Sequence, residues 1–177
     1  MQKTKQQTLK PQDIVVCLQL ALNSRIESIQ TLSQMLGISA AEVHGALKRA
    51  ENSKLIEARS DKRTVISTAL TEFLIHGLKY AFPPQTGSMA TGVITGIAAI
   101  EAIKGKFAPT EALPHVWPSP EGQTIGIALA PLFSSVPEAA IANPQLHKAL
   151  ALVDAIRAGA AREKEFAVQE IRLMLAT

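Results

Sequence analysis

The stretch between residues 28 and 56 constrains the fold more than any other part of this 177-residue chain. Ser28 can cap a helix, and apolar side chains then recur at helical spacing until Gly37, which suits the left-handed turn that ends a helix. Ser39 opens the next segment, and Glu42 completes an S-x-x-E capping box in which each side chain satisfies the other residue's free backbone N–H. The stretch therefore predicts two short helices that meet at a tight turn. Their apolar positions are Ile29, Leu32, Leu36, Val43, Ala46, Leu47 and Ala50.

A small basic ribbon is expected after the second of these helices. Residues 55–59 and 64–67 have the composition of short strands. Ser60-Asp61-Lys62-Arg63 has the polar and charged residues of a turn between them. Two antiparallel strands with a basic tip directly after a helix form what is called a wing.

Helices are predicted on both sides of this unit. Pro11 suits the first turn of a helix whose apolar stripe runs to about Asn23. Thr68 can cap a further helix over residues 69–80, which Pro83-Pro84 would end.

The net positive charge of the chain is concentrated in its first third. The net charge is +3, but residues 1–63 carry ten Lys and Arg against six Asp and Glu, whereas residues 64–177 carry eight against nine. The first segment is therefore at +4 and the second at −1. A positive field of this kind attracts phosphates.

These residues together resemble bacterial winged helix-turn-helix transcriptional regulators, broadly of the MarR-like group, over residues 9–80 only. Ser33 stands where such motifs usually carry alanine. The resemblance covers less than half of the chain and implies a winged helix-turn-helix with duplex DNA as its partner. It is carried by Leu32, Gly37, Ile38, Ser39, Val43 and Leu47, and by the basic ribbon that follows.

The candidate DNA-binding residues are those that the second helix and the ribbon would turn outward. The major groove is about 12 Å wide and admits one helix, whose small residues would allow a close approach to the bases. Basic residues would contact phosphates or guanine, and those of the ribbon would contact the backbone or the minor groove. The candidates are Ser39, Ala40, Ala41, His44, Lys48 and Arg49 on the helix, and Arg59, Lys62 and Arg63 on the ribbon. An ordinary solvated helix face is the alternative reading of the basic positions.

The second half of the chain is less explicit. Residues 83–115 are rich in Gly, Ser and Thr and are expected to form an irregular linker or loop, although residues 93–103 have weak helical character. The residues around Trp117 suggest a short hairpin, with Ser119-Pro120-Glu121-Gly122 as its turn. Three further helical segments are predicted: a short helix from the capped start at residues 135–138 to residue 142, a helix opened by Asn143-Pro144 that runs until Gly159, and a continuation over residues 160–176.

The fold class expected is mainly α with a small β wing. We divide the chain into a winged helix-turn-helix domain over residues 1–82, a linker over 83–115, and a helical region over 116–177 that mediates dimerisation or binds a partner. The alternative for the last region is that its helices pack back on the first domain and complete one core.

The sequence predicts neither an enzyme nor a cofactor. It contains no H-E-x-x-H and no G-x-S-x-G, and its four histidines are scattered singly. The single cysteine, Cys17, forms no metal-binding pair, so no metal site is expected. No apolar run approaches the roughly 20 residues that span a bilayer. We therefore expect a cytoplasmic protein without a membrane partner.

The function expected is that of a sequence-specific DNA-binding transcriptional regulator, acting as a homodimeric repressor. Two copies would bring two recognition helices to successive major grooves, about 34 Å apart. The alternative is an antitoxin-like or accessory subunit of a two-gene system, in which the second half holds a protein partner. The operator, the effector and the sign of regulation do not follow from the sequence.

Overall fold

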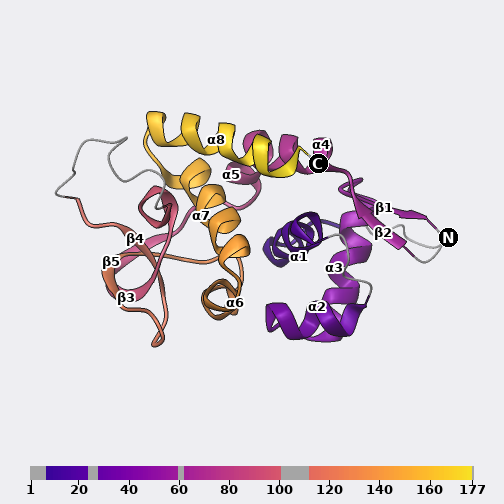
Figure 1. Ribbon diagram of the computed structural model, residues 1–177, viewed down its shortest axis with the longest axis horizontal. Coiled ribbons are helices and arrows are strands. Elements are labelled where there is room, and N and C mark those ends of the chain that lie inside the picture. The colour runs from indigo at the N-terminus through magenta and orange to yellow at the C-terminus, as the bar shows by residue number, and fades with distance from the viewer. Residues whose placement is uncertain (1–6, 24–27, 60–61, 101–111, 177) are drawn as a thin grey trace.

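The computed structural model describes residues 7–23, 28–59, 62–100 and 112–176, and it is mostly helical with two small sheets. The first half contains three helices followed by a two-stranded ribbon, and this order is the predicted one (Figure 1). Its elements are α1 (Pro11–Leu22), α2 (Ile29–Leu36), α3 (Ala40–Asn52), β1 (Ile56–Arg59) and β2 (Lys62–Val65).

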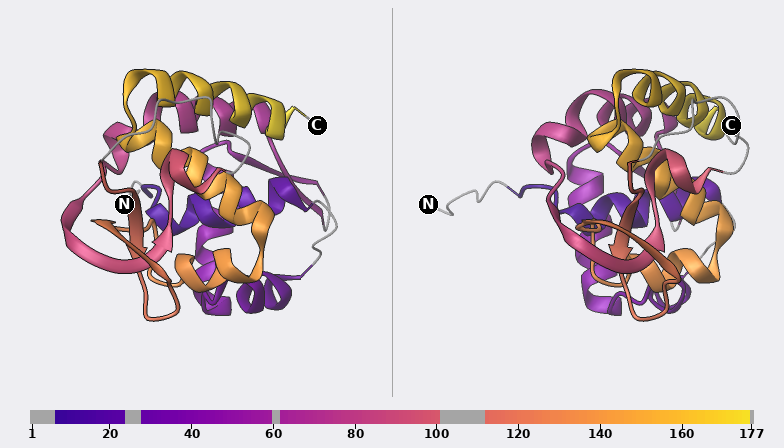
Figure 2. Two further views of the ribbon diagram at one scale, coloured as in Figure 1. Left: turned by 60° about the vertical axis from the view of Figure 1, so that its left-hand side comes forward. Right: turned by 90° about the vertical axis from the view of Figure 1, so that its left-hand side faces the viewer.

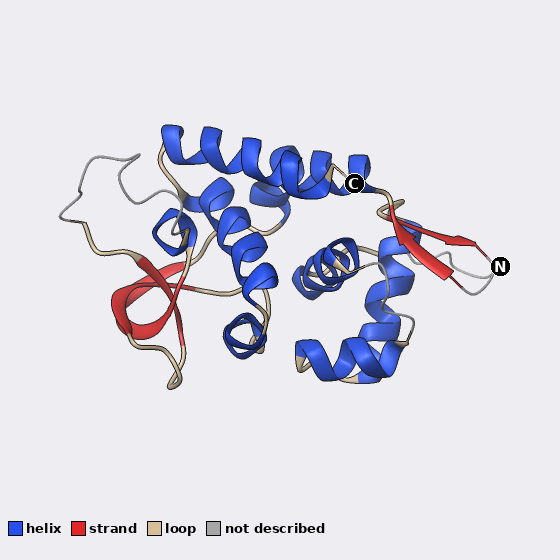
Figure 3. Cartoon of the chain, in the orientation of Figure 1, coloured by secondary structure: helices blue, strands red, loops and turns tan. Residues whose placement is uncertain are grey.

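The second half contains a three-stranded sheet and a group of helices that cover one another (Figure 3). Its elements are α4 (Ser67–Glu72), the π-helical turn η1 (Phe73–Gly77), α5 (Leu78–Ala81), β3 (Thr86–Ile94), the 3-10 turn η2 (Gly96–Ala99), β4 (His115–Pro118), β5 (Thr124–Leu129), α6 (Val136–Ala142), α7 (Pro144–Ala158) and α8 (Ala161–Leu175).

Local signals fix the turn between α2 and α3. The Ser28 hydroxyl accepts a hydrogen bond from the Thr31 backbone N–H at 3.0 Å and caps α2. Gly37 ends the helix with φ of 61°, a left-handed conformation that glycine adopts without a steric penalty. Both predictions for this turn are confirmed.

The ribbon is tighter than predicted. β1 and β2 are antiparallel, and Arg59 lies opposite Lys62 in their register. Lys62 and Arg63 therefore belong to strand β2, whereas the sequence placed them in the turn. The helical segment that follows begins at Ser67 rather than after a Thr68 cap, and it contains a π-helical turn that the sequence did not indicate.

The prediction of an irregular linker over residues 83–115 is wrong for its first part, because residues 86–94 form the nine-residue strand β3. The predicted hairpin around Trp117 is also wrong. β4 and β5 run parallel to each other, and each pairs antiparallel with β3, which closes the three strands on themselves. The stretch 101–111, which includes the end of the weak helix, lies outside the described residues.

The closed sheet depends on glycine at the crossing of its strands. Gly92 of β3 pairs with Pro118 on one side and with Thr124 on the other. A Cβ atom at this position would overlap the backbone carbonyl of Trp117. Only a residue without a side chain allows the strands to approach this closely.

Helix α7 lies at the centre of the second half and is buried on all sides along most of its length. It packs against α8, η2, α6 and α1, while α8 also lies beside α4 (Figure 2). A single apolar core therefore runs from α1 through α3 to α7 and α8. Most apolar residues of α6, α7 and α8 are covered within the chain, as in the alternative that the sequence left open, whereas Ile141 and Leu173 are exposed. None of the described helices is long and apolar enough to cross a bilayer.

A buried polar cluster joins the small sheet to α7. The Asp154 carboxylate accepts hydrogen bonds from the Trp117 indole at 2.7 Å, the Thr95 hydroxyl at 2.9 Å and the Arg157 guanidinium at 2.8 Å. Burial raises the pKa of Asp154 in spite of the neighbouring Arg157. Trp117 is thus a core residue, and its indole N–H is satisfied.

We predict that Gly92→Ala lowers the free energy of unfolding by about 3 kcal/mol, because the new methyl group would force two strands apart. Gly87→Ala in the same strand is the matched control, since its Cβ would lie 3.4 Å from the Ala128 Cβ, an ordinary contact. Urea denaturation measures both. Equal stability of the two variants would contradict the close crossing at Gly92.

Candidate nucleic-acid interface

The side chains of α3 form a buried face and an exposed face. Val43, Ala46, Leu47 and Ala50 are at most 1% exposed and face the core. Ala41, His44, Lys48 and Asn52, which recur at helical spacing, are exposed on the opposite side. Ser39 is exposed and Ala40 partly exposed at the start of the helix. All the candidates on α3 except Arg49 therefore lie at or near one outer face.

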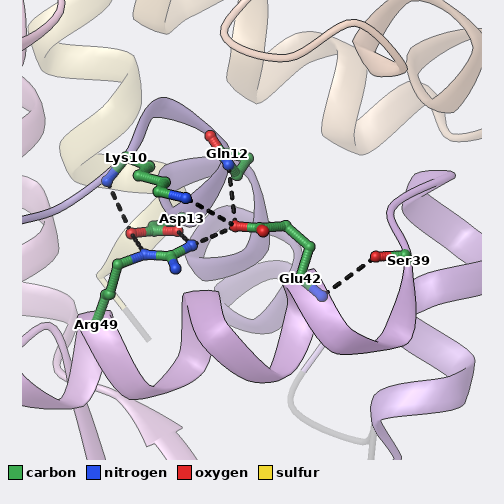
Figure 4. A network of polar contacts seen from close by, with 6 residues as sticks. All are labelled: Lys10, Gln12, Asp13, Ser39, Glu42 and Arg49. Atoms are coloured by element: carbon green, nitrogen blue, oxygen red, sulfur yellow. Dashed lines mark hydrogen bonds and ion pairs between the residues drawn. The ribbon is translucent and has the colours of Figure 1, made fainter.

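The structure corrects the expectation for Arg49. Its guanidinium faces α1, where Nε donates to Asp13 Oδ2 at 2.8 Å and Nη2 donates to Asp13 Oδ1 at 2.7 Å (Figure 4). Nη2 also donates to Glu42 Oε1 at 2.5 Å. Because Asp13 is fully buried and the Arg49 side chain is only 14% exposed, this two-pronged pair ties α3 to α1. Arg49 is not free to contact DNA.

Glu42 takes part in the same cluster, so the predicted capping box forms only by half. The Ser39 hydroxyl accepts from the Glu42 backbone N–H at 3.2 Å, as expected. The Glu42 carboxylate, however, turns away from Ser39 and accepts from Arg49 and from the Gln12 amide, with Lys10 Nζ 3.8 Å away (Figure 4). The hydrogen bond from Arg49 lowers the pKa of Glu42, and its bonds to Asp13 and Glu42 raise the pKa of Arg49.

The ribbon is held against the end of α3 by a second ion pair. Arg63 Nε donates to Glu51 Oε1 at 2.7 Å, and both side chains are partly exposed. Arg63 thus has part of its charge neutralised, which makes it an anchor as well as a candidate contact. Lys62 is exposed on the other face of β2. Arg59 lies opposite it in the ladder, and its side chain lies outside the described structure.

The described cations near α3 therefore fall into two groups. Lys10, Arg49 and Arg63 are paired with carboxylates. Lys48, Lys54 and Lys62 are exposed and form no ion pair with any residue that the structure describes. The free lysines follow the outer face of α3, its end and the ribbon, so a phosphate backbone could be met along this line.

Two residues of this surface were missed by sequence reasoning. The Asn52 amide donates to Gln7 Oε1 at 2.7 Å, which brings the start of the described chain to the end of α3. Its position four residues after Lys48 was a signal that could have placed it on the outer face. Lys54 was not among the predicted contacts, and only the structure reveals its backbone conformation.

The site residues predicted from the sequence all lie in the first half of the chain. Within the ranges that the structure describes, no three His, Cys, Asp or Glu side chains come together in a way that could hold a metal ion. His147, for which the sequence offered no partner, hydrogen-bonds through Nε2 to the Ile94 carbonyl at 2.7 Å and lies against Trp117. Cys17 is buried, and burial raises its thiol pKa.

Comparison with known proteins does not extend this description: no family model, no curated protein and no solved structure matches the chain.

We predict that Asp13→Ala lowers the free energy of unfolding by about 3 kcal/mol, because it leaves the Arg49 guanidinium without its buried partner. Glu42→Gln removes a more exposed carboxylate from the same cluster, so it should cost less than about 1 kcal/mol. Chemical denaturation at neutral pH measures both. Losses of similar size would show that the Arg49–Asp13 pair does not dominate the cluster.

The lowered pKa of Glu42 also predicts a pH dependence. A carboxyl group whose pKa is lower in the folded state stabilises the protein above its unfolded pKa, about 4.3, and loses that contribution as the pH falls through the folded pKa. The stability difference between the wild type and Glu42→Gln should therefore be constant from pH 7 to pH 5 and shrink below about pH 4. A difference that grows on acidification would contradict the ion pair with Arg49.

Proposed function

We propose that α1–α3 and the β1–β2 ribbon form a winged helix-turn-helix domain that binds duplex DNA, with α3 in the major groove. The protein would act as a sequence-specific transcriptional regulator, as a repressor in the cytoplasm. One observation carries the proposal: the outer face of α3 bears small residues, His44 and Lys48, while the acidic Glu42 is turned inward and bonded to Arg49. A helix surface without free carboxylates is what a phosphate-lined groove requires.

The residue sizes along α3 support this docking. Ala40, Ala41 and Gly45 lie in the first half of the helix, so its backbone could approach the base edges closely. Ser39 and His44 would then be the side chains nearest the bases, and Lys48 would reach a phosphate or a guanine. The N-terminus of a helix also favours a phosphate through its unpaired N–H groups.

The ribbon would act as the wing. Lys62 is exposed and is the cross-strand neighbour of Arg59. By position the two residues therefore form a basic pair at the end of the ribbon where β1 turns into β2. Contacts from such a strand pair would go to the DNA backbone or to the adjacent minor groove. Arg63 would fix the angle of the wing through Glu51, and its partly exposed guanidinium would still face the DNA side.

The DNA-binding prediction is tested with Lys48→Gln and a random-sequence duplex, because phosphate contacts do not depend on sequence. We expect the wild type to bind with an affinity that falls steeply with salt, and Lys48→Gln to bind about tenfold more weakly at low salt, with a salt slope smaller by about 0.9. Fluorescence anisotropy at several salt concentrations measures both quantities. The duplex upstream of the protein's own gene, compared with the random one, measures sequence specificity.

Arg162→Gln is the matched control, because it removes one exposed positive charge at the start of α8, on the side of the molecule away from the ribbon (Figure 1). It should leave the salt slope unchanged. Absence of salt-dependent binding to any duplex, or equal effects of the two substitutions, would overturn the assignment of α3 as the DNA-contacting helix.

Homodimerisation is part of the proposal, because one α3 per chain reads only one half-site. The apolar side of α7 is occupied within the chain, so a dimer would have to use another surface. We expect a molar mass in solution of about twice 18.9 kDa in light scattering. A mass of one chain that persists on the specific duplex would exclude the dimeric mode and leave the contact through α3 untouched.

A further inference from the structure

Lys54 adopts a backbone conformation that lysine rarely takes. Its φ is +60°, and it is the one non-glycine residue with a positive φ in the part of the chain that the structure describes. Two hydrogen bonds hold this geometry: Lys54 N–H donates to the Glu51 carbonyl at 3.1 Å, and Leu55 N–H donates to the Ala50 carbonyl at 3.0 Å. This pair of bonds is a Schellman motif, which satisfies the last carbonyls of α3.

Glycine is the usual residue at this position, since a side chain on a left-handed residue is sterically strained. Gly37 occupies the corresponding position after α2, with nearly the same φ of +61°. The chain thus uses glycine at one helix end of this unit and lysine at the next. Strained backbone positions that retain a large side chain are concentrated at functional sites.

No described contact of the Lys54 side chain offsets the strain of placing a lysine at this backbone position. The side chain is exposed and forms no ion pair or hydrogen bond among the described residues. It borders a groove of about 380 Å³ between the end of α3 and strand β1. Glu51 and Glu57 also line the groove, and Glu51 is bonded to Arg63. The ammonium group therefore lies where the helix ends and the ribbon begins.

We propose that Lys54 is a DNA-backbone contact that links the phosphates met by α3 to those met by the ribbon. The proposal rests on the function proposed above. Lys48 lies four residues before the end of α3 at Asn52, a rise of about 6 Å along the helix axis, and Lys54 follows beyond that end. This rise already exceeds the 3.4 Å axial spacing of phosphates on one strand. The two lysines would consequently bind different phosphates, and Lys62 would bind a third.

Three substitutions at this position separate charge from strain. Lys54→Gln removes the charge and keeps the strained side chain, Lys54→Gly removes both, and Lys54→Arg keeps both. On the random-sequence duplex, the Gln and Gly variants should each lose several-fold in affinity at low salt and lower the salt slope by about 0.9, while the Arg variant should match the wild type. In thermal unfolding, Lys54→Gly should melt about 2–4 °C above Lys54→Gln, because it relieves the strain.

A lysine that merely favours the C-terminal dipole of α3 gives a different result. In that case all three variants would bind DNA as the wild type does, and only their melting temperatures would differ. If Lys48→Gln lowers the salt slope but Lys54→Gln does not, the role of Lys54 is refuted and DNA binding through α3 stands. If the wild type binds no duplex, the proposed function fails and the role of Lys54 fails with it.

Discussion

The buried ion pair between Arg49 and Asp13 determines which side of α3 faces outward. A helix is nearly symmetric about its axis, so apolar burial alone tolerates modest rotations of α3 against its neighbours. The two parallel hydrogen bonds of Arg49 to Asp13 do not, because even a small rotation would separate the guanidinium from a carboxylate that has no access to water. The orientation of His44 and Lys48 toward solvent is thus a consequence of a contact on the other side of the helix.

Helix α1 carries this constraint into the second half of the chain. It packs against α3 on one side and α7 on the other, and the Asn143 amide donates to the Gln19 side chain at 3.1 Å. The Ser135 hydroxyl donates to the Leu36 carbonyl at 2.6 Å, directly before the Gly37 turn. The second half therefore contacts the first half at α1 and at the turn that precedes α3. The bond from Ser135 thus places the start of α6 in direct contact with the turn before α3.

Local signals in the sequence were sufficient for the first half and insufficient for the second. The caps, the glycine turn and the apolar spacing of α2 and α3 involve residues at most a few positions apart, and their order was predicted. Strand β3 was not, because its Gly, Ser and Thr residues have the composition of a loop and are ordered by partners far along the chain. Gly92, for example, was taken as a sign of irregular structure, yet it is the point at which three strands cross.

In the candidate site, too, the sequence does not reveal contacts between side chains that are far apart in the chain. Helical spacing places Arg49 on a different face from the apolar residues, but it does not reveal that a buried carboxylate 36 positions earlier lies opposite. For the same reason, the net positive charge of the first third of the chain suggests more cations accessible to a ligand than the structure contains. Three of them neutralise Asp13, Glu42 and Glu51 and thereby hold α1, α3 and the ribbon together. The paired cations fix the framework, and the field that a phosphate would meet comes from Lys48, Lys54 and Lys62, whose side chains remain in solvent.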